Sequence, residues 1–194
     1  MKKQIDVFDY SGEIMKRLAK GVLLTTKANG KVNTMSISWG ALGIEWNKPI
    51  FTTYVRKGRF TRELLDANGE FTVNIPMDGS DLSLIGKCGS VSGRDTDKIA
   101  ANSLTLVEGE KVSVPAIKEY PLTLECRVTY KQLQDDAAIA PEDLAKFYKP
   151  GYGGTHIAYC GEIVAILERV VRYARYVKAK EDRQEGKKTH RNKL

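Results

Sequence analysis

The sequence predicts a mainly β fold, a closed or nearly closed barrel with helices around it. Two observations carry this prediction. Asn29-Gly30 lies between two segments with strand composition, and this dipeptide tolerates the positive φ that a type I′ hairpin turn needs at both central positions. Several more short segments are rich in β-branched or aromatic residues, whereas helical periodicity is confined to short stretches. Many short strands with few helices are typical of barrels.

The first elements follow one another closely. Ser11 can cap a short helix with an apolar side, and Gly21 supplies a stop for it. After Gly21 the apolar period changes from helical to alternating. Strands at residues 21 to 27 and 32 to 39 then form the predicted hairpin.

Further strands are predicted at residues 49 to 55, 70 to 75, 104 to 107, 122 to 131 and 156 to 167. Helices are expected at residues 61 to 68, 81 to 85, 95 to 101 and 142 to 148. The last of these lies in a long irregular connection, residues 132 to 154, which is rich in Pro and Gly. Long connections of this kind are often lids.

The net charge of +7 is unevenly distributed. Residues 1 to 168 carry 21 Lys and Arg against 21 Asp and Glu, whereas residues 169 to 194 carry 10 against 3. We therefore assign residues 1 to 168 to one domain and residues 169 to 194 to a basic helical extension that ends in a disordered tail. An apolar stripe along residues 170 to 177 could clasp a partner. A basic tail can bind nucleic acid, but a solvated extension is the commoner case.

Localisation follows from what the chain contains. No run approaches the roughly 20 apolar residues of a membrane span, and acidic residues follow Met1-Lys2-Lys3 where the apolar part of a signal peptide would begin. The three cysteines are far apart and form no C-x-x-C pair, so neither a disulfide framework nor a metal site is indicated. A cytoplasmic protein is expected.

Catalytic motifs of hydrolases and zinc enzymes are missing, and only two histidines are present. A chain with so few acid, base and metal candidates can take its chemistry from a cofactor. The best anion site is a basic turn: Arg56, Lys57 and Arg59 surround Gly58 just before the helix that begins near Phe60 or Thr61. Backbone N–H groups and the positive helix end would join these cations around a phosphate, although such a cluster can also be a solvated loop.

Four segments resemble one known family in order and spacing. Asn33-Thr-Met-Ser-Ile-Ser-Trp-Gly40 is similar to the N-x-M-(S/T)-x-S-W strand of FMN-binding flavin reductase-like proteins, and the turn at residues 55 to 61 lies where their phosphate loop follows the next strand. Residues 88 to 98 resemble the C-G-x-x-S-G-R-D-x-D-K segment of the family, and residues 156 to 162 resemble its H-x-x-x-x-G-E strand. The resemblance spans residues 12 to 168 and implies a Greek-key split β-barrel of the flavin reductase and flavoredoxin group.

The resemblance implies roles for individual residues. Polar groups of the first motif would line the isoalloxazine ring, Trp39 would cover it, and the basic turn would hold the phosphate. Lys98 would approach the ring and stabilise its reduced form, and His156 would touch the ring or an incoming nicotinamide. Without the resemblance, Lys98 reads as a surface lysine paired with Asp95 or Asp97 and His156 as a structural histidine. The implied cofactor-binding set is Asn33, Thr34, Met35, Ser36, Ser38, Trp39, Val55, Arg56, Lys57, Arg59, Phe60, Thr61, Cys88 and Lys98.

The function implied by the resemblance is hydride transfer from NAD(P)H to FMN and then electron delivery to a flavin or protein acceptor, within a homodimer. A flavoredoxin-like electron carrier, reduced by a partner protein, is the first alternative. The second is a non-catalytic split barrel that holds another ligand while its basic tail touches nucleic acid. No G-x-G-x-x-G segment follows a strand, so a nicotinamide would bind as a transient visitor and not in a Rossmann crevice.

Overall fold

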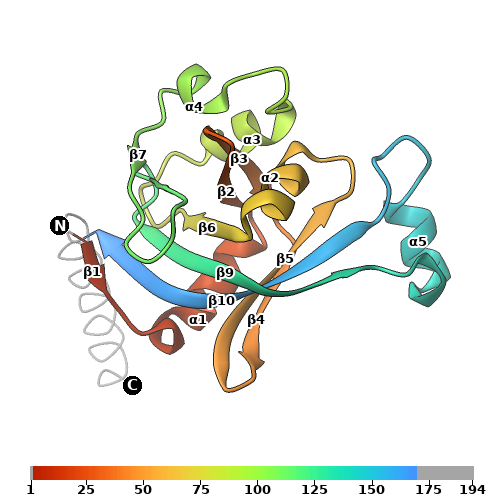
Figure 1. Ribbon diagram of the computed structural model, residues 1–194, viewed down its shortest axis with the longest axis horizontal. Coiled ribbons are helices and arrows are strands. Elements are labelled where there is room, and N and C mark those ends of the chain that lie inside the picture. Colours follow the sequence, from red (N-terminus) through yellow and green to blue (C-terminus); the bar gives the residue numbers. More distant parts are fainter. Residues whose placement is uncertain (1, 170–194) are drawn as a thin grey trace, which may run out of the picture.

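The computed structural model describes residues 2 to 169, with the side chains of residues 3 to 168. The predicted extension from residue 170 onward, including its apolar stripe, lies outside the described residues. Eight antiparallel strands form one curved sheet in the order β3-β2-β6-β9-β10-β5-β4, with β1 paired to β10 (Figure 1). The mainly β fold class is confirmed.

The hairpin around Asn29-Gly30 is also confirmed. It joins β2 (Val22–Ala28) to β3 (Lys31–Ile37), with Val22 opposite Ile37 and Ala28 opposite Lys31. Both turn residues have positive φ, 50° at Asn29 and 75° at Gly30, as a type I′ turn requires.

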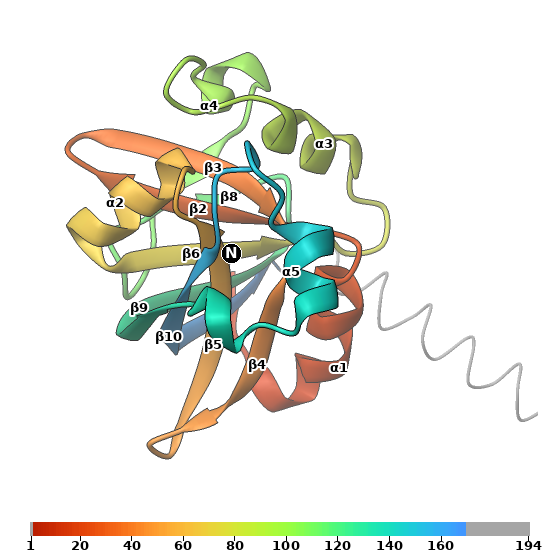
Figure 2. The ribbon, with the colours of Figure 1, turned by 90° about the vertical axis from the view of Figure 1, so that its right-hand side faces the viewer.

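A second hairpin was not predicted. It joins β4 (Gly40–Glu45) to β5 (Lys48–Arg56), and it projects from the body of the molecule in Figures 1 and 2. Its turn residues, Trp46 and Asn47, have φ of 50° and 58°. A bulky residue is rare in this left-handed region, so the sequence lacks the usual turn signal here.

The centre of the sheet consists of β6 (Glu70–Ile75), β9 (Leu122–Leu133) and β10 (His156–Arg169). The main core packs in the concavity of this sheet and includes Ile14, Phe51, Phe71 and Tyr159. Gly161 faces Phe71, whose ring carbons would lie 2.6 Å from an added Cβ. The strand therefore needs glycine where it crosses this ring.

Helix α1 (Val7–Leu18) starts earlier than predicted. Its N-cap is Asp6, whose carboxylate accepts a hydrogen bond of 2.9 Å from the Phe8 N–H, so the expectation that Ser11 caps this helix was wrong. Ser11 instead donates to the Phe8 carbonyl inside the helix. Gly21, with φ of 109°, follows the helix end as expected.

The remaining elements lie around the sheet, with β1 and α5 on opposite sides of the molecule in Figure 1. They are β1 (Lys2–Gln4), α2 (Phe60–Asn68), α3 (Ser83–Ser90), α4 (Lys98–Ala101), β7 (Leu106–Val107), β8 (Ala116–Ile117), the 3₁₀ turn Asp136–Ala138 and α5 (Pro141–Phe147). Helix α3 begins two residues later and ends five residues later than the helix predicted at residues 81 to 85. Helix α4 begins at Lys98, three residues later than predicted, because Asp97 caps it.

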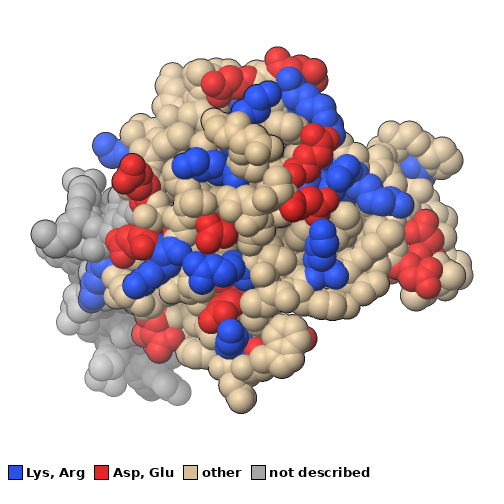
Figure 3. Space-filling view, viewed as in Figure 1, with Lys and Arg blue, Asp and Glu red and all other residues tan. Residues whose placement is uncertain are grey.

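Charged side chains of both signs alternate over the face shown in Figure 3. This mixture agrees with the balanced count of charges in residues 1 to 168. No described helix combines the length and apolar character that a membrane crossing requires.

Candidate functional site

A cavity of about 170 Å³ lies where β3, the start of α2 and the segment between α3 and α4 meet. We call it the inner lobe. Seven of the predicted cofactor-binding residues line it: Asn33, Met35, Ser36, Arg59, Phe60, Thr61 and Lys98.

A second cavity of about 150 Å³, the outer lobe, opens beside it toward β5 and β10. Met35, Ser36 and Arg59 line both lobes, so the two cavities adjoin, and we call them together the cleft. Each lobe alone is below the roughly 300 Å³ at which small-molecule sites begin, and only the two volumes together, about 170 and about 150 Å³, reach that size. The outer lobe adds Ser38, Trp39 and Arg56 from the predicted cofactor-binding set, and also His156, which was expected to touch the ring or a nicotinamide.

The start of α2 forms one wall of the inner lobe. Arg59 is the N-cap and provides no side-chain cap for the first N–H groups of the helix. The buried Thr61 hydroxyl accepts a 2.9 Å hydrogen bond from the Asn33 side-chain amide, which ties α2 to β3. A helix start with uncapped N–H groups beside an arginine attracts an anion such as a phosphate.

Two glycines within residues 88 to 98, Gly89 near the end of α3 and Gly93 between α3 and α4, bring the backbone of this segment onto β3. A Cβ at Gly93 would overlap the side-chain oxygen of Asn33 and lie 3.0 Å from a ring carbon of Phe60. A Cβ at Gly89 would overlap the Ser36 hydroxyl. Glycine at both positions therefore lets polar groups of β3 and the backbone of this segment share one wall of the cleft.

Lys98 is a buried cation at the inner lobe, only 5% exposed. Its Nζ donates a 2.9 Å hydrogen bond to the Cys88 carbonyl, and within the described chain it forms no ion pair with a carboxylate. Burial lowers the pKa of Lys98, and the positive charge of Arg59 acts in the same direction. The surface-lysine alternative is wrong, because Asp97 instead caps α4 through the N–H groups of Ile99 and Ala100.

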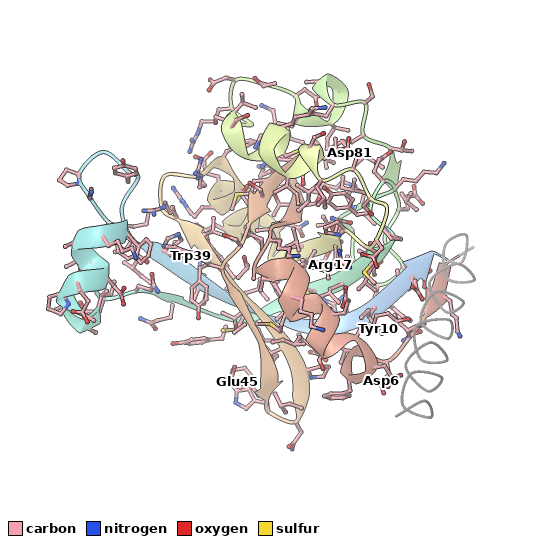
Figure 4. The ribbon with its side chains drawn as sticks, turned by 180° about the vertical axis from the view of Figure 1, so that it is seen from behind. Asp6, Tyr10, Arg17, Trp39, Glu45 and Asp81 are labelled. Atoms are coloured by element: carbon pink, nitrogen blue, oxygen red, sulfur yellow. The ribbon has the colours of Figure 1, made fainter. Side chains whose placement is uncertain are left out.

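His156 and Trp39 form the far wall of the outer lobe. Their rings are 5.0 Å apart, and Trp39 also contacts Phe147 edge-on at 5.2 Å, so α5 packs against this wall (Figure 4). His156 is 5% exposed, and its Nδ1 lies 2.9 Å from the Tyr148 hydroxyl. Burial and then the charges of Arg56 and Arg59 lower the pKa of His156 to about 4, so the ring is neutral at physiological pH.

Arg56 has a different environment from the one predicted. It lines the outer lobe, but its guanidinium donates to the carbonyls of Phe147 at 2.9 Å and Gly154 at 3.1 Å. It also lies over the Tyr148 ring at 5.2 Å. Arg56 therefore holds the connection between α5 and β10 against the cleft through hydrogen bonds. Arg59 is the cation of the basic turn that is more available to bind an anion.

Four predicted residues line neither lobe: Thr34, Val55, Lys57 and Cys88. Thr34 and Val55 are fully buried, and the Thr34 hydroxyl bonds to Thr25 and to the Leu24 carbonyl. Cys88 belongs to a small core cluster, where burial raises the pKa of its thiol. As direct flavin contacts these four stay predictions.

Sequence reasoning did not single out Arg94 or the glycines at 58, 89 and 93 as site residues. Arg94 lines the inner lobe, donates to the Gly58 carbonyl at 3.0 Å and pairs with Glu63. It thereby holds the segment after α3 against the basic turn. The sequence signal that could have identified Gly93 and Arg94 is Ser92-Gly93-Arg94, which is part of the family-like segment at residues 88 to 98.

The comparisons agree with this geometry. A family model described as "Flavin reductase like domain" matches residues 15–176. The chain belongs to the flavin reductase-like domain family. This membership supports a flavin cofactor. Within the described residues, no group of three or more His, Cys, Asp or Glu side chains is arranged to hold a metal ion.

Two curated relatives match part of the chain. An uncharacterized protein of Archaeoglobus fulgidus is 37% identical over 98 residues, which are 50% of this chain and 54% of the relative. The uncharacterized protein YddH of Escherichia coli is 33% identical over 110 residues, 55% of this chain and 57% of the relative. The chain thus matches little more than half the length of these relatives.

Solved structures resemble most of the described fold. Flavoredoxin from Methanosarcina acetivorans is 30% identical, with a TM-score of 0.60 over 77% of this chain and 68% of that chain. The flavin reductase PheA2 shares the fold at 17% identity, with a TM-score of 0.55 over 77% of this chain and 79% of that one. An FMN-binding flavin reductase-like protein from Shewanella baltica is 18% identical, with a TM-score of 0.60 over 87% and 77% of the two chains. The predicted family and split-barrel fold are confirmed.

Proposed function

We propose that this chain is an NAD(P)H-dependent flavin reductase that binds FMN in the two-lobed cleft. The observation that carries the proposal is Lys98, a buried ammonium at the cleft with one carbonyl partner and no carboxylate partner in the described chain. Such a cation is costly to keep unless a negative charge joins it. A flavin whose ring becomes more negative on reduction supplies that charge.

The residues present fit FMN. Arg59 and the uncapped start of α2 suit its phosphate, because they combine a cation with free backbone donors. Asn33 and Ser36 give β3 a polar edge, and the backbone at Gly89 and Gly93 lies close against these two side chains. Bound FMN would supply the redox chemistry, accepting a hydride from a reduced nicotinamide and passing electrons to a second acceptor. The protein would bind it, orient it and favour its reduced form.

The test is an ultraviolet-visible spectrum of the purified full chain after addition of FMN and desalting, followed by anaerobic NADH and NADPH. We expect retained flavin bands near about 370 and 450 nm that bleach with a nicotinamide. Retained bands that resist both nicotinamides would overturn the reductase proposal. A protein that retains no flavin, yet binds DNA with steep salt dependence, would support a non-catalytic barrel instead.

A flavoredoxin-like electron carrier is the second candidate. It is favoured by the 30% identity to the flavoredoxin from Methanosarcina acetivorans, which exceeds the identity to the flavin reductase PheA2. A carrier would retain FMN that dithionite reduces but NADH and NADPH do not. The spectrum therefore separates the two candidates.

We also propose that the protein is a cytoplasmic homodimer. Two-fold dimers are the commonest symmetric oligomers, and the projecting β4–β5 hairpin carries the exposed Ile44 and Trp46. The free cysteines suit a reducing compartment. Light scattering coupled to size-exclusion chromatography should give twice the chain mass of 21.6 kDa, and a mass of one chain would contradict the dimer.

A further inference from the structure

A chain of hydrogen bonds behind the outer lobe fixes the protonation of His156. The backbone N–H of His156 lies 3.3 Å from Oε1 of Gln134, and the Tyr148 hydroxyl lies 3.0 Å from the same atom. The same hydroxyl oxygen lies 2.9 Å from Nδ1 of His156. The side chains of Gln134, Tyr148 and His156 and the His156 backbone N–H thus form a closed loop of hydrogen bonds.

The donors and acceptors in this loop can be assigned in only one way. A backbone N–H can only donate, so the Gln134 atom that faces it must be the oxygen. That oxygen can only accept, so the Tyr148 hydroxyl donates its single proton to Gln134. The Tyr148 oxygen must then accept from His156, which places the ring proton on Nδ1.

A neutral ring with its proton on Nδ1 carries an unprotonated Nε2. This nitrogen makes no hydrogen bond to any residue in the described part of the chain, and the ring lines the outer lobe. The lobe is lined by Arg56 and Arg59 and, within the described residues, by no carboxylate. Trp39 supplies an aromatic wall 5.0 Å from the imidazole ring.

We infer that Gln134 and Tyr148 are positioning residues that hold His156 with a bare Nε2, and that this nitrogen accepts a hydrogen bond from an N–H group of a planar, phosphate-bearing ligand in the outer lobe. The ligand chemistry follows from the lining: an acceptor for the N–H, an aromatic wall for the plane and Arg59 for the phosphate. Two ligands share this chemistry, a nicotinamide dinucleotide through its carboxamide and FMN through its ring imide. This ligand assignment rests on the proposed function, whereas the tautomer does not.

The tautomer is measured by long-range ¹H–¹⁵N correlation spectra of the uniformly ¹⁵N-labelled full chain at pH 7. Only His156 and His190 contribute imidazole signals, and H190Q assigns them. We expect His156 to show a protonated Nδ1 and a bare Nε2. A proton on Nε2 would overturn the inference whatever the protein catalyses.

Variants test the positioning roles without relying on activity. Y148F removes the acceptor of the Nδ1 proton, so His156 should shift toward the Nε2-protonated form. Q134L should do the same, whereas Q134E keeps an acceptor oxygen and should restore the wild-type tautomer. The matched control is Y152F, since Tyr152 is an exposed tyrosine of the same connection. A Y148F spectrum identical to that of wild type would refute the positioning role.

Two pairs of probes identify the N–H donor through the Nε2 resonance. FMN is compared with N3-methyl-FMN, and, on the FMN-loaded protein, NAD⁺ is compared with 3-acetylpyridine adenine dinucleotide, which lacks the carboxamide N–H. A shift with FMN but not with its methylated form assigns the flavin imide, and the corresponding difference for NAD⁺ assigns the carboxamide. The assigned ligand should bind Y148F about 3- to 10-fold more weakly, the effect of losing one hydrogen bond. If binding of both FMN and NAD⁺ leaves Nε2 unmoved, the ligand assignment is wrong even though the flavin reductase proposal stands.

Discussion

The burial of Lys98 makes a prediction that separates a functional lysine from a structural one. K98M keeps the length and apolar stem of the side chain and removes only its charge and its donors. In the free protein, the loss of the 2.9 Å hydrogen bond to the Cys88 carbonyl is offset by the loss of a buried charge. In the proposed flavin complex, the same change would remove a cation that lines the inner lobe. Stability and binding should therefore respond differently.

The magnitudes follow from the environment of the ammonium. A charged hydrogen bond contributes about 1.5–3 kcal/mol, and burying an ammonium costs several kcal/mol, so the free energy of unfolding should change by less than about 1 kcal/mol. That corresponds to less than about 4 °C in Tm for a chain of this size. Opposite charges about 4 Å apart attract by about 4 kcal/mol at an effective dielectric of 20. After desolvation we expect about 1–2 kcal/mol of this in binding, or roughly 5- to 30-fold in Kd.

The assays are thermal unfolding of the flavin-free protein, titration with FMN and measurement of the midpoint potential. A tenfold preferential loss of affinity for reduced flavin lowers the two-electron potential by about 30 mV. K87M is the matched control, because Lys87 is an exposed lysine of helix α3, whose Cys88 carbonyl accepts from Lys98. A K98M protein that melts several degrees lower, while FMN affinity and potential stay at wild-type values, would show that Lys98 is structural and refute the reasoning.

Three more predictions test the walls of the cleft. G93A should lose about 1–3 kcal/mol of stability and most of its flavin retention, because the new methyl group overlaps Asn33; G86A, where a Cβ meets nothing within 4 Å, is the control in thermal melts. Between pH 7 and pH 4, the free energy of unfolding of wild type should fall by up to about 3 kcal/mol more than that of H156Q. The reason is that His156 takes up a proton near pH 6.5 in the unfolded state and only near about pH 4 in the folded state. Equal decreases for the two proteins in urea titrations would contradict the lowered pKa. R56A should speed limited proteolysis between residues 147 and 154, since Arg56 holds both ends of that stretch, whereas K146A should leave the rate unchanged.

Local signals in the sequence predicted those parts of the fold that depend on local chemistry. Asn29-Gly30 predicted its hairpin because both turn residues must have positive φ. The β4–β5 hairpin escaped prediction because Trp46 occupies the same region of φ without a local preference for it. Tertiary pairing to β5 along the whole strand stabilises that turn, and pairing partners are not visible in a single sequence.

In the candidate site, too, some features follow from neighbouring residues and others depend on tertiary contacts. Arg59 and Thr61 could be placed at a helix start from their neighbours alone, and the structure puts both at the inner lobe. The burial of Lys98 could not be predicted from neighbouring residues, because it depends on α4 packing against β3 and on the Cys88 carbonyl ten residues away. The hydrogen bonds by which Arg56 holds the connection between α5 and β10 go to carbonyls more than ninety positions later in the chain.

The order of the strands explains why such distant segments meet. β3 lies at one end of the sheet path and β10 with β5 lies toward the other, so the curvature of the sheet must bring the ends together for Ser36 and His156 to line one lobe. Close approach then depends on residues without side chains, and Gly89 and Gly93 occupy the points of contact with β3. Because the cleft is closed by backbone contact, a single added methyl group at Gly93 should widen it while leaving every charged residue in place. Loss of flavin in G93A with all cations intact would show that the shape of the cleft, as well as its charge, holds the cofactor.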